Sequence, residues 1–183
     1  MEIIQNDISS LLSACKKGNQ RAQMQLYRQF SGAMYNTAYR ILGNADDAED
    51  ALQEGFITAF EKLDEVREVE KFPGWIKTTI LRKALTLAEQ KKKTIPLHPE
   101  TPIREEKKGD ENEEVNAQKT ILWNSIQQLK SNYKNILIMM YYEGMDYEEI
   151  SEIMGLSYGN CRTLASRAKE QLKTIVKNKA NVS

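Results

Sequence analysis

Residues 146–172, DYEEISEIMGLSYGNCRTLASRAKEQL, decide the fold of the C-terminal part of the chain. Apolar residues recur at helical spacing up to Met154, which predicts a short amphipathic helix. Gly155 follows, and glycine readily adopts the positive φ that a tight turn between two helices requires. Ser157 can then accept a hydrogen bond from the free amides of the next helix. The stretch therefore predicts two helices joined by a short turn.

The second of these helices has an apolar face and a basic face. Its apolar positions are Cys161, Leu164, Ala165, Ala168 and Leu172. On or near the other face lie Asn160, Arg162, Thr163, Ser166, Arg167 and Lys169. A pair of this form is typical of a helix-turn-helix, which places its second helix in the major groove of DNA. A helical hairpin within a bundle is the alternative, but the glycine, the cap and the basic face together favour DNA reading.

The composition predicts an all-α fold. The 183 residues include only nine glycines and four prolines, 40% are hydrophobic, and long spans have helical periodicity. We expect two small helical domains, residues 1–92 and 117–183, the second containing the helix-turn-helix. Residues 93–116 lack apolar periodicity and hold three of the prolines, which predicts a flexible linker.

Other features of the sequence argue against a membrane protein and against a metal site. No apolar run approaches the length of a membrane span, and the N-terminus lacks a signal-peptide pattern, so we expect a cytoplasmic protein without membrane insertion. Cys15 and Cys161 occupy apolar helical positions, as core residues of a protein in a reducing compartment do. The single histidine, His98, lies in a Pro-flanked stretch, so nothing suggests a metal, a cofactor or histidine-based catalysis.

The zero net charge conceals blocks of opposite sign. Residues 46–70 are mainly acidic and residues 71–93 mainly basic, and the acidic stretch 143–152 precedes the basic stretch 162–179. Mixed charge can serve solubility alone. Blocks of opposite sign are more typical of a protein that meets DNA on some faces and a protein partner on others.

The periodicity also predicts the remaining helices. Before the linker we expect helices over residues 7–17, 19–30, 32–42, 45–63 and 73–90, with Asp7 and Asn19 as caps and Gly18 and Gly43 as stops. After the linker we expect one apolar face of Ile121, Leu122, Ile126 and Leu129. A further helix, capped by Ser131, should turn Tyr133, Ile136, Leu137, Met140 and Tyr141 inward.

Three segments, in this order, resemble a bacterial RNA polymerase sigma factor of the extracytoplasmic-function (ECF) group of the sigma-70 family. Residues 44–63, NADDAEDALQEGFITAFEKL, are similar to the helix that docks on the polymerase clamp. Residues 71–87, KFPGWIKTTILRKALTL, are similar to the helix that reads the promoter −10 element. Residues 136–172, which include the segment EGMDYEEI, resemble the −35-reading domain.

The resemblance implies a promoter-specificity subunit that binds core RNA polymerase and promoter DNA, is not an enzyme, and is paired with an anti-sigma factor. Polymerase docking would use Asp47, Glu49, Asp50, Gln53 and Glu54. Contact with −10 DNA would use Phe72, Lys77, Thr78, Arg82, Lys83 and Thr86, with Phe72 held against an extruded base. Contact with −35 DNA would use Tyr158, Asn160, Arg162, Thr163, Ser166, Arg167 and Lys169, with Arg162 and Asn160 reaching base edges.

The chain departs from the family pattern at three positions. Lys130 stands where a proline is common, Leu164 where the recognition helix usually has a basic residue, and Arg82 where the −10 helix typically has an asparagine. Two alternatives stay open, and Leu164 and Arg82 are what keep the second one open. One is a helix-turn-helix regulator that binds duplex DNA without polymerase, and the other is an adaptor that binds polymerase without reading a promoter.

Overall fold

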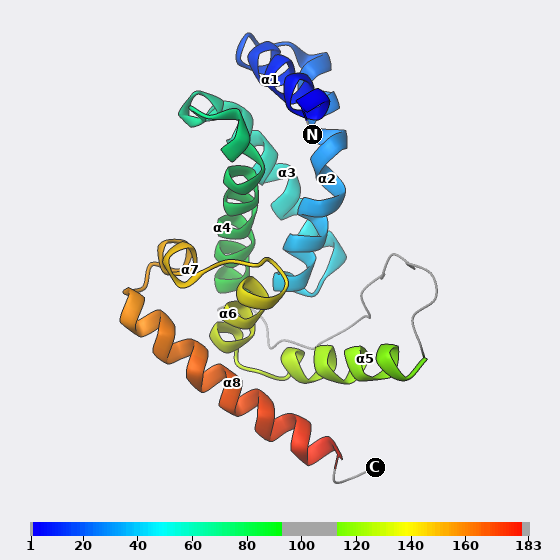
Figure 1. Cartoon of the computed structure of the whole chain (residues 1–183), viewed down its shortest axis with the longest axis vertical. Coiled ribbons are helices and arrows are strands. Elements are labelled where there is room, and N and C mark those ends of the chain that lie inside the picture. Colours follow the sequence, from blue (N-terminus) through cyan, green and yellow to red (C-terminus); the bar gives the residue numbers. More distant parts are fainter. Residues whose placement is uncertain (1, 93–112, 181–183) are drawn as a thin grey trace. The chain divides into compact units, whose positions relative to one another are not determined.

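A computed structural model describes residues 2–92 and 113–180 of the chain. Within these ranges all regular structure is helical, which confirms the predicted fold class (Figure 1). The chain divides into two compact units, Met1–His98 and Pro99–Ser183. Most of the predicted linker lies outside the described residues.

The N-terminal unit contains four α-helices and two short 3-10 turns. In chain order they are α1 (Glu2–Lys16), α2 (Gln20–Leu42), α3 (Ala45–Glu61), η1 (Leu63–Glu65), η2 (Val69–Lys71) and α4 (Phe72–Lys92). Helices α2, α3 and α4 pack on one another, and α1 packs against α2 and the two 3-10 turns (Figure 1). The two turns form a connector between α3 and α4.

The ends of these helices match the predicted caps in most places. Asn19 accepts hydrogen bonds from the amides of Arg21 and Ala22 at 3.0 and 3.2 Å, and Gly43 ends α2 at a φ of 73°. Two predictions were wrong. Helix α1 begins at Glu2, so Asp7 is not its cap. The predicted helices 19–30 and 32–42 are one helix. A lone glycine such as Gly32 costs a helix only about 1 kcal/mol, and no capping residue interrupts the backbone hydrogen bonds there.

The core of the N-terminal unit lies where α2, α3 and α4 meet. Its largest fully buried side chains are Leu26, Ile41, Phe72, Ile76, Ile80 and Leu81. Gly55 of α3 faces Ile80 of α4 so closely that an added Cβ would lie 3.3 Å from Ile80 Cγ1 and clash with Cδ1. Gly55 therefore permits a close crossing of α3 and α4 that no larger residue would allow without rearrangement.

The C-terminal unit also contains four described helices. They are α5 (Glu113–Gln127), α6 (Ser131–Tyr141), α7 (Tyr147–Met154) and α8 (Tyr158–Ala180). Helix α8 packs against α5, α6 and α7 (Figure 1). Helix α5 begins at Glu113, four residues before the predicted start of this domain, so the last part of the predicted linker is helical.

Helix α6 is buried nearly all round, which its sequence pattern did not reveal. Residues 135–139 are all buried, as expected for a helix at the centre of a small bundle. Tyr141 was predicted to face inward but is 62% exposed, because it lies in the last turn, beyond the packed part of the helix. Ser131 is the first helical residue rather than the cap, and Lys130 in the cap position makes no side-chain bond.

No helix among the described residues is both long and apolar enough to span a membrane.

Candidate functional site

An acidic stripe covers the exposed side of α3. The Asn44 side chain accepts a hydrogen bond from the Asp47 amide at 3.1 Å and fixes the start of this helix. Four of the five predicted polymerase-docking residues are exposed on α3, namely Glu49, Asp50, Gln53 and Glu54. Glu54 also forms a 3.6 Å ion pair with Lys83 of α4, and both partners are partly exposed. The stripe presents negative charge on a rigid helix, with Glu54 at the border of α4.

Asp47 does not belong to this stripe. It is 8% exposed and its carboxylate bonds to the ammonium of Lys91 near the end of α4. Its position in the first turn of α3 places it toward α4 rather than toward solvent. Asp47 therefore joins α3 to α4 in this structure and is not part of the exposed stripe, and its predicted contact with polymerase stays a prediction.

One exposed apolar residue lies within the acidic stripe. Ile57 is 59% exposed and follows Asp50 and Gln53 by seven and four positions, so all three share one side of α3. Ile57 was not predicted as a site residue. The signal was present in the sequence, because Ile57 is apolar but falls outside the inward-facing set that includes Phe56 and Phe60. Large exposed aliphatic residues among charges are typical of interaction surfaces.

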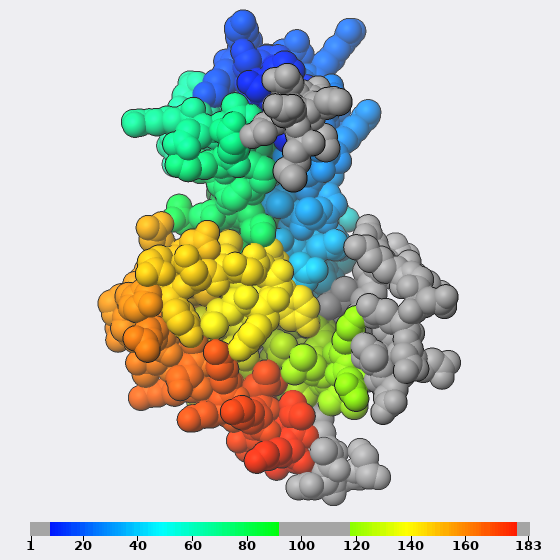
Figure 2. Space-filling model, viewed as in Figure 1, coloured from blue at the N-terminus to red at the C-terminus, as the bar shows by residue number. Residues whose placement is uncertain are grey.

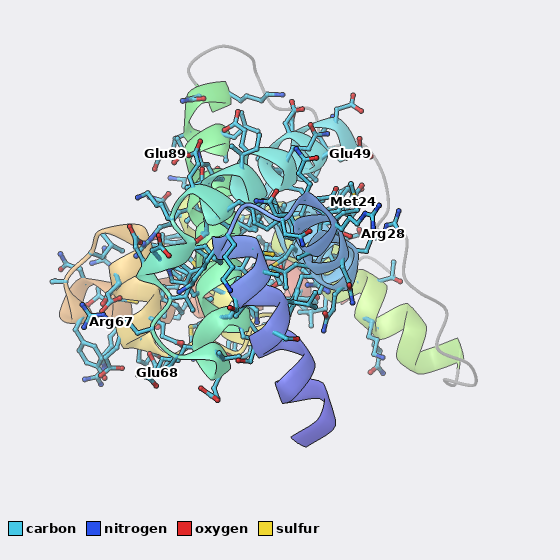
Figure 3. The ribbon with its side chains drawn as sticks, turned by 90° about the horizontal axis from the view of Figure 1, so that it is seen from above. Met24, Arg28, Glu49, Arg67, Glu68 and Glu89 are labelled. Atoms are coloured by element: carbon cyan, nitrogen blue, oxygen red, sulfur yellow. The ribbon has the colours of Figure 1, made fainter. Side chains whose placement is uncertain are left out.

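The side of the unit that carries Glu49 also carries residues of α2. Figure 3 shows Glu49 with Met24 and Arg28 of α2 on one side, apart from Glu89 of α4. Met24 is 52% exposed, and the neighbouring Tyr27 packs edge-on against Phe56 of α3 with ring centroids 4.7 Å apart. The side of the unit that carries Glu49 thus also presents an exposed apolar residue of α2.

A groove of about 420 Å³ lies between α3 and α4. Its lining combines cations, hydroxyls, an indole and two carboxylates, and includes Thr58, Trp75, Thr79, Arg82, Lys83, Thr86, Glu54 and Glu65. Arg82 and Thr86 are exposed, while Trp75 is only half-buried. A groove with an aromatic wall and basic edges suits a single nucleic-acid strand.

Two predicted −10 residues, Phe72 and Lys77, do not line the groove. Phe72 is fully buried, with its ring centroid 5.3 Å from that of Phe30 and 6.2 Å from that of Trp75, so it cannot stack on a base. Lys77 is five positions before Arg82, which rotates it by about 140° around the helix. The structure brings Arg82, Lys83 and Thr86 together in the groove and leaves Phe72 in the core.

The helix-turn-helix has the predicted turn and cap. Gly155 ends α7 at a φ of 64°, and the Ser157 hydroxyl accepts a hydrogen bond from the Asn160 amide at 3.2 Å. Most predicted −35 residues are exposed on α8, namely Tyr158, Asn160, Arg162, Thr163, Ser166 and Arg167. In the space-filling view, α7 and the first turns of α8, in orange, lie open at the surface (Figure 2).

Two basic residues of α8 lie over tyrosine rings. Arg162 Cζ is 6.0 Å from the centroid of Tyr158, and Lys169 Nζ is 5.6 Å from the centroid of Tyr141. Lys169 is half-buried, seven positions after Arg162, and therefore lies on the same flank two turns further along. The buried stripe of α8 consists of Cys161, Ala165 and Ala168, as the periodicity predicts.

The two cysteines are buried and unpaired. Cys15 lies in the core of the N-terminal unit and Cys161 in that of the C-terminal unit, and burial raises the pKa of both thiols. The described residues contain no cluster of potential metal ligands.

Comparison with known proteins assigns each unit to a family region. Sigma-70 region 2 matches residues 26–94, and sigma-70 region 4 matches residues 119–172. The RNA polymerase sigma factor SigV of Bacillus subtilis (strain 168) is 30% identical over 139 residues, which cover 76% of this chain and 81% of the relative. The ECF RNA polymerase sigma factor SigW of the same strain is 27% identical over 183 residues, covering 91% and 95%.

Solved structures share the fold. One is the sigma factor RpoE in complex with the anti-sigma factor NepR from Bartonella quintana, with a TM-score of 0.64, 18% identity and coverage of 84% of this chain and 96% of that one. Another is CnrH in complex with the cytosolic domain of CnrY, with a TM-score of 0.59, 20% identity and coverage of 92% and 96%.

A helical unit of region 2 followed by a helix-turn-helix unit of region 4 defines a promoter-recognition subunit, and the chain belongs to the sigma-70 family. Within this family it is an RNA polymerase sigma factor of the ECF type, a class that binds core polymerase and promoter DNA to initiate transcription. Sigma factors are in general initiation factors rather than enzymes.

Proposed function

We propose that three surfaces divide the work of this sigma factor: the acidic stripe of α3 binds core polymerase, the α3–α4 groove binds the −10 strand, and α8 reads −35 DNA. The observation that supports this division best is the acidic stripe. It exposes Glu49, Asp50 and Gln53 around the apolar Ile57, whereas Asp47 is bonded to Lys91. Capping explains acids in the first turn of a helix but does not explain an exposed isoleucine beside them.

On the acidic stripe, charge and apolar contact would have different roles. The carboxylates face a basic surface of polymerase and mainly set the association rate and orientation. Ile57 supplies desolvated contact area at the centre of the interface, where most binding energy concentrates. Glu54 already forms an ion pair with Lys83, so it contributes less to polymerase binding than Asp50 does.

In the groove, the −10 strand would pass along Arg82 and Thr86, with Lys83 at the α3 side. Thr78 lies one turn before Arg82 on α4 and does not line the groove. Trp75, rather than Phe72, provides the aromatic surface, because Trp75 lines the groove while Phe72 is buried. Stacking of one base on such a ring contributes about 1–3 kcal/mol. Because Arg82 replaces a typical asparagine, the preferred −10 sequence differs from that of relatives with the asparagine.

On α8, the exposed residues near the Ser157 cap enter the major groove first. Arg162 can bind both acceptors of a guanine edge, and Asn160 and Thr163 lie beside it on the open face. Arg167 and Lys169 lie further along and contact phosphates, which position the helix without carrying sequence information.

We further propose that the chain acts in the cytoplasm, performs no catalysis itself, and is held inactive by an anti-sigma factor. The two fold neighbours are each described in complex with another protein, an anti-sigma factor in the first case. An anti-sigma factor would compete with core polymerase for the acidic stripe.

The proposal is tested by core-polymerase binding of charge-matched variants. Glu49→Lys on the stripe and Glu89→Lys on α4 change the net charge equally but lie apart on the unit (Figure 3). Glu49→Lys should slow association with core polymerase and reduce its salt dependence, whereas Glu89→Lys should not. Ile57→Ser should raise the dissociation constant at least about fivefold.

Equal binding by all three folded variants would show that the stripe is not part of the polymerase interface.

Run-off transcription on a genomic fragment library then tests promoter reading. Core polymerase with the chain should start at discrete sites that core polymerase alone does not use. Binding without such starts would indicate an adaptor rather than a promoter-reading factor.

A further inference from the structure

Two tyrosines meet where the helices of the helix-turn-helix begin. Tyr147 is the first residue of α7 and Tyr158 the first residue of α8. Their ring centroids are 5.9 Å apart with an interplanar angle of 86°. This edge-to-face geometry is a favoured arrangement of two aromatic rings. The pair connects the two helices outside the buried core, because Tyr158 is 45% exposed.

Local hydrogen bonds fix the helix N-termini that carry the two rings. Asp146 and Glu149 form a reciprocal capping box, with bonds of 2.9 and 3.0 Å, which sets the first residue of α7. Ser157 sets the first residue of α8 through its bond to the Asn160 amide. Two caps, each determined by nearby sequence, thereby hold two rings at the positions where they meet.

The second ring leads directly to the proposed base-reading arginine. Arg162 follows Tyr158 by four positions, so the two side chains lie on one face of α8. The guanidinium carbon is 6.0 Å from the ring centroid, at the outer range of a cation–π contact. An exposed arginine otherwise samples many rotamers, and ordering it on binding DNA costs entropy. The Tyr158 ring beneath Arg162 limits the rotamers that the arginine side chain samples before DNA binds.

We propose that Tyr147 and Tyr158 form an aromatic brace that positions Arg162 for reading the −35 element. Tyr147 is then a positioning residue for sequence preference, although it lies on the helix that does not read bases. The inference rests on the proposed role of Arg162. It assigns Tyr158 a support function in place of direct contact with DNA.

The chain offers a matched control for this brace. Lys169 lies over Tyr141 much as Arg162 lies over Tyr158, and Tyr141 is also exposed. Lys169 is assigned to phosphate, so disturbing its ring should weaken binding to all promoters alike. Tyr141→Leu therefore removes an exposed tyrosine beneath a cation without touching base readout.

The test is competitive transcription from a library with a randomised −35 element, using holoenzyme made from the full chain. Arg162→Ala should flatten the preference at one or two positions. Tyr147→Leu should reduce the preference at the same positions by about two- to fivefold. Tyr147→Phe and Tyr158→Phe should keep it, since the rings remain, and Tyr141→Leu should lower output uniformly. Tyr147→Leu added to Arg162→Ala should cause no further loss of preference.

Each contrary result has a separate meaning. Parental preference in Arg162→Ala would overturn the −35 assignment, whereas parental preference in Tyr147→Leu alone would overturn the brace. A changed preference in Tyr158→Phe would show that the hydroxyl touches DNA directly, which also overturns the brace. If Tyr147→Leu does not fold, Tyr147→Met removes the ring from the same position with an apolar side chain, and parental preference in this variant would overturn the brace.

Discussion

Single residues in this protein act through partners that are remote in the sequence. Asp47 bonds to Lys91, Gly55 accommodates Ile80, and Phe72 packs on Phe30. The first two contacts join α3 to α4 across the connector, and the third joins α2 to α4. The function of such residues is to define the positions of the exposed ones.

The buried thiols allow a prediction at this scale. Burial raises the pKa of Cys15 and Cys161, so the reactive thiolate is scarcer in the folded protein than in the unfolded chain. Iodoacetamide at neutral pH should label both cysteines slowly in the native protein and rapidly in denaturant, as measured by mass spectrometry. Fast native labelling of Cys161 would contradict its place in the core.

The raised pKa of the two thiols also predicts how the stability of the protein changes with pH. A raised pKa in the fold means that the folded state favours the protonated thiol. The resulting stabilisation of the folded state is fully present below the ordinary thiol pKa of about 8.5. It is lost as the pH rises from there through the raised value. The free energy of unfolding should therefore decline over alkaline pH, and less so in a Cys15→Ala, Cys161→Ala variant.

At the scale of elements, α1 holds the connector that precedes α4. Lys16 Nζ donates a hydrogen bond to the Val66 carbonyl at 3.1 Å and lies 4.0 Å from an Asp64 carboxylate oxygen. Asp64 is almost fully exposed, so the ion pair contributes little and the backbone bond matters more. The whole of α1 precedes the residues matched by region 2, yet it contacts both 3-10 turns.

Removing this bond should loosen the connector. Lys16→Met keeps the aliphatic stem but no longer donates to Val66, and should lower the free energy of unfolding by about 0.5–1.5 kcal/mol. Lys17→Met, at the neighbouring exposed position, is the matched control. Urea denaturation monitored by circular dichroism measures both. Equal values for the two variants would mean that α1 does not hold the connector through Lys16.

Elements also show what the sequence could predict. Gly155, Ser157 and Asn19 were predictable, because caps and tight turns depend on chemistry within a few residues. The buried face of α3 was also predictable, because it follows from the helical spacing of the apolar residues within that helix. The burial of Phe72 and of Asp47 was not predictable, since it depends on partners 42 and 44 positions away, Phe30 and Lys91. Acidic residues in a helix look alike in sequence whether they face solvent or a lysine.

At the scale of the whole molecule, each unit has its own core. The first is built around Leu26 and Ile80 and the second around Ile136 and Ile150, all fully buried. We therefore propose that residues 1–92 and the region from Glu113 onward are separate domains.

This division predicts that each part folds alone. Fragments 1–98 and 113–183 should each be helical and unfold cooperatively, and their circular dichroism spectra should sum to that of the full chain. The second fragment should be the less stable, because a smaller domain buries a smaller share of its surface. A second fragment that gains helix only when the first is added would contradict the two-domain assignment.

The absence of a side chain at Gly55 has a mechanical consequence. Where α3 crosses α4, no compressible layer separates the backbone of one helix from Ile80 of the other. Close-packed contacts of this kind deform little and transmit strain. The helix that carries the acidic stripe and the helix that lines the groove therefore behave as one stiff lever. On the roles proposed above for the two helices, a load applied by polymerase at the acidic stripe would reach a promoter strand in the groove with little slack.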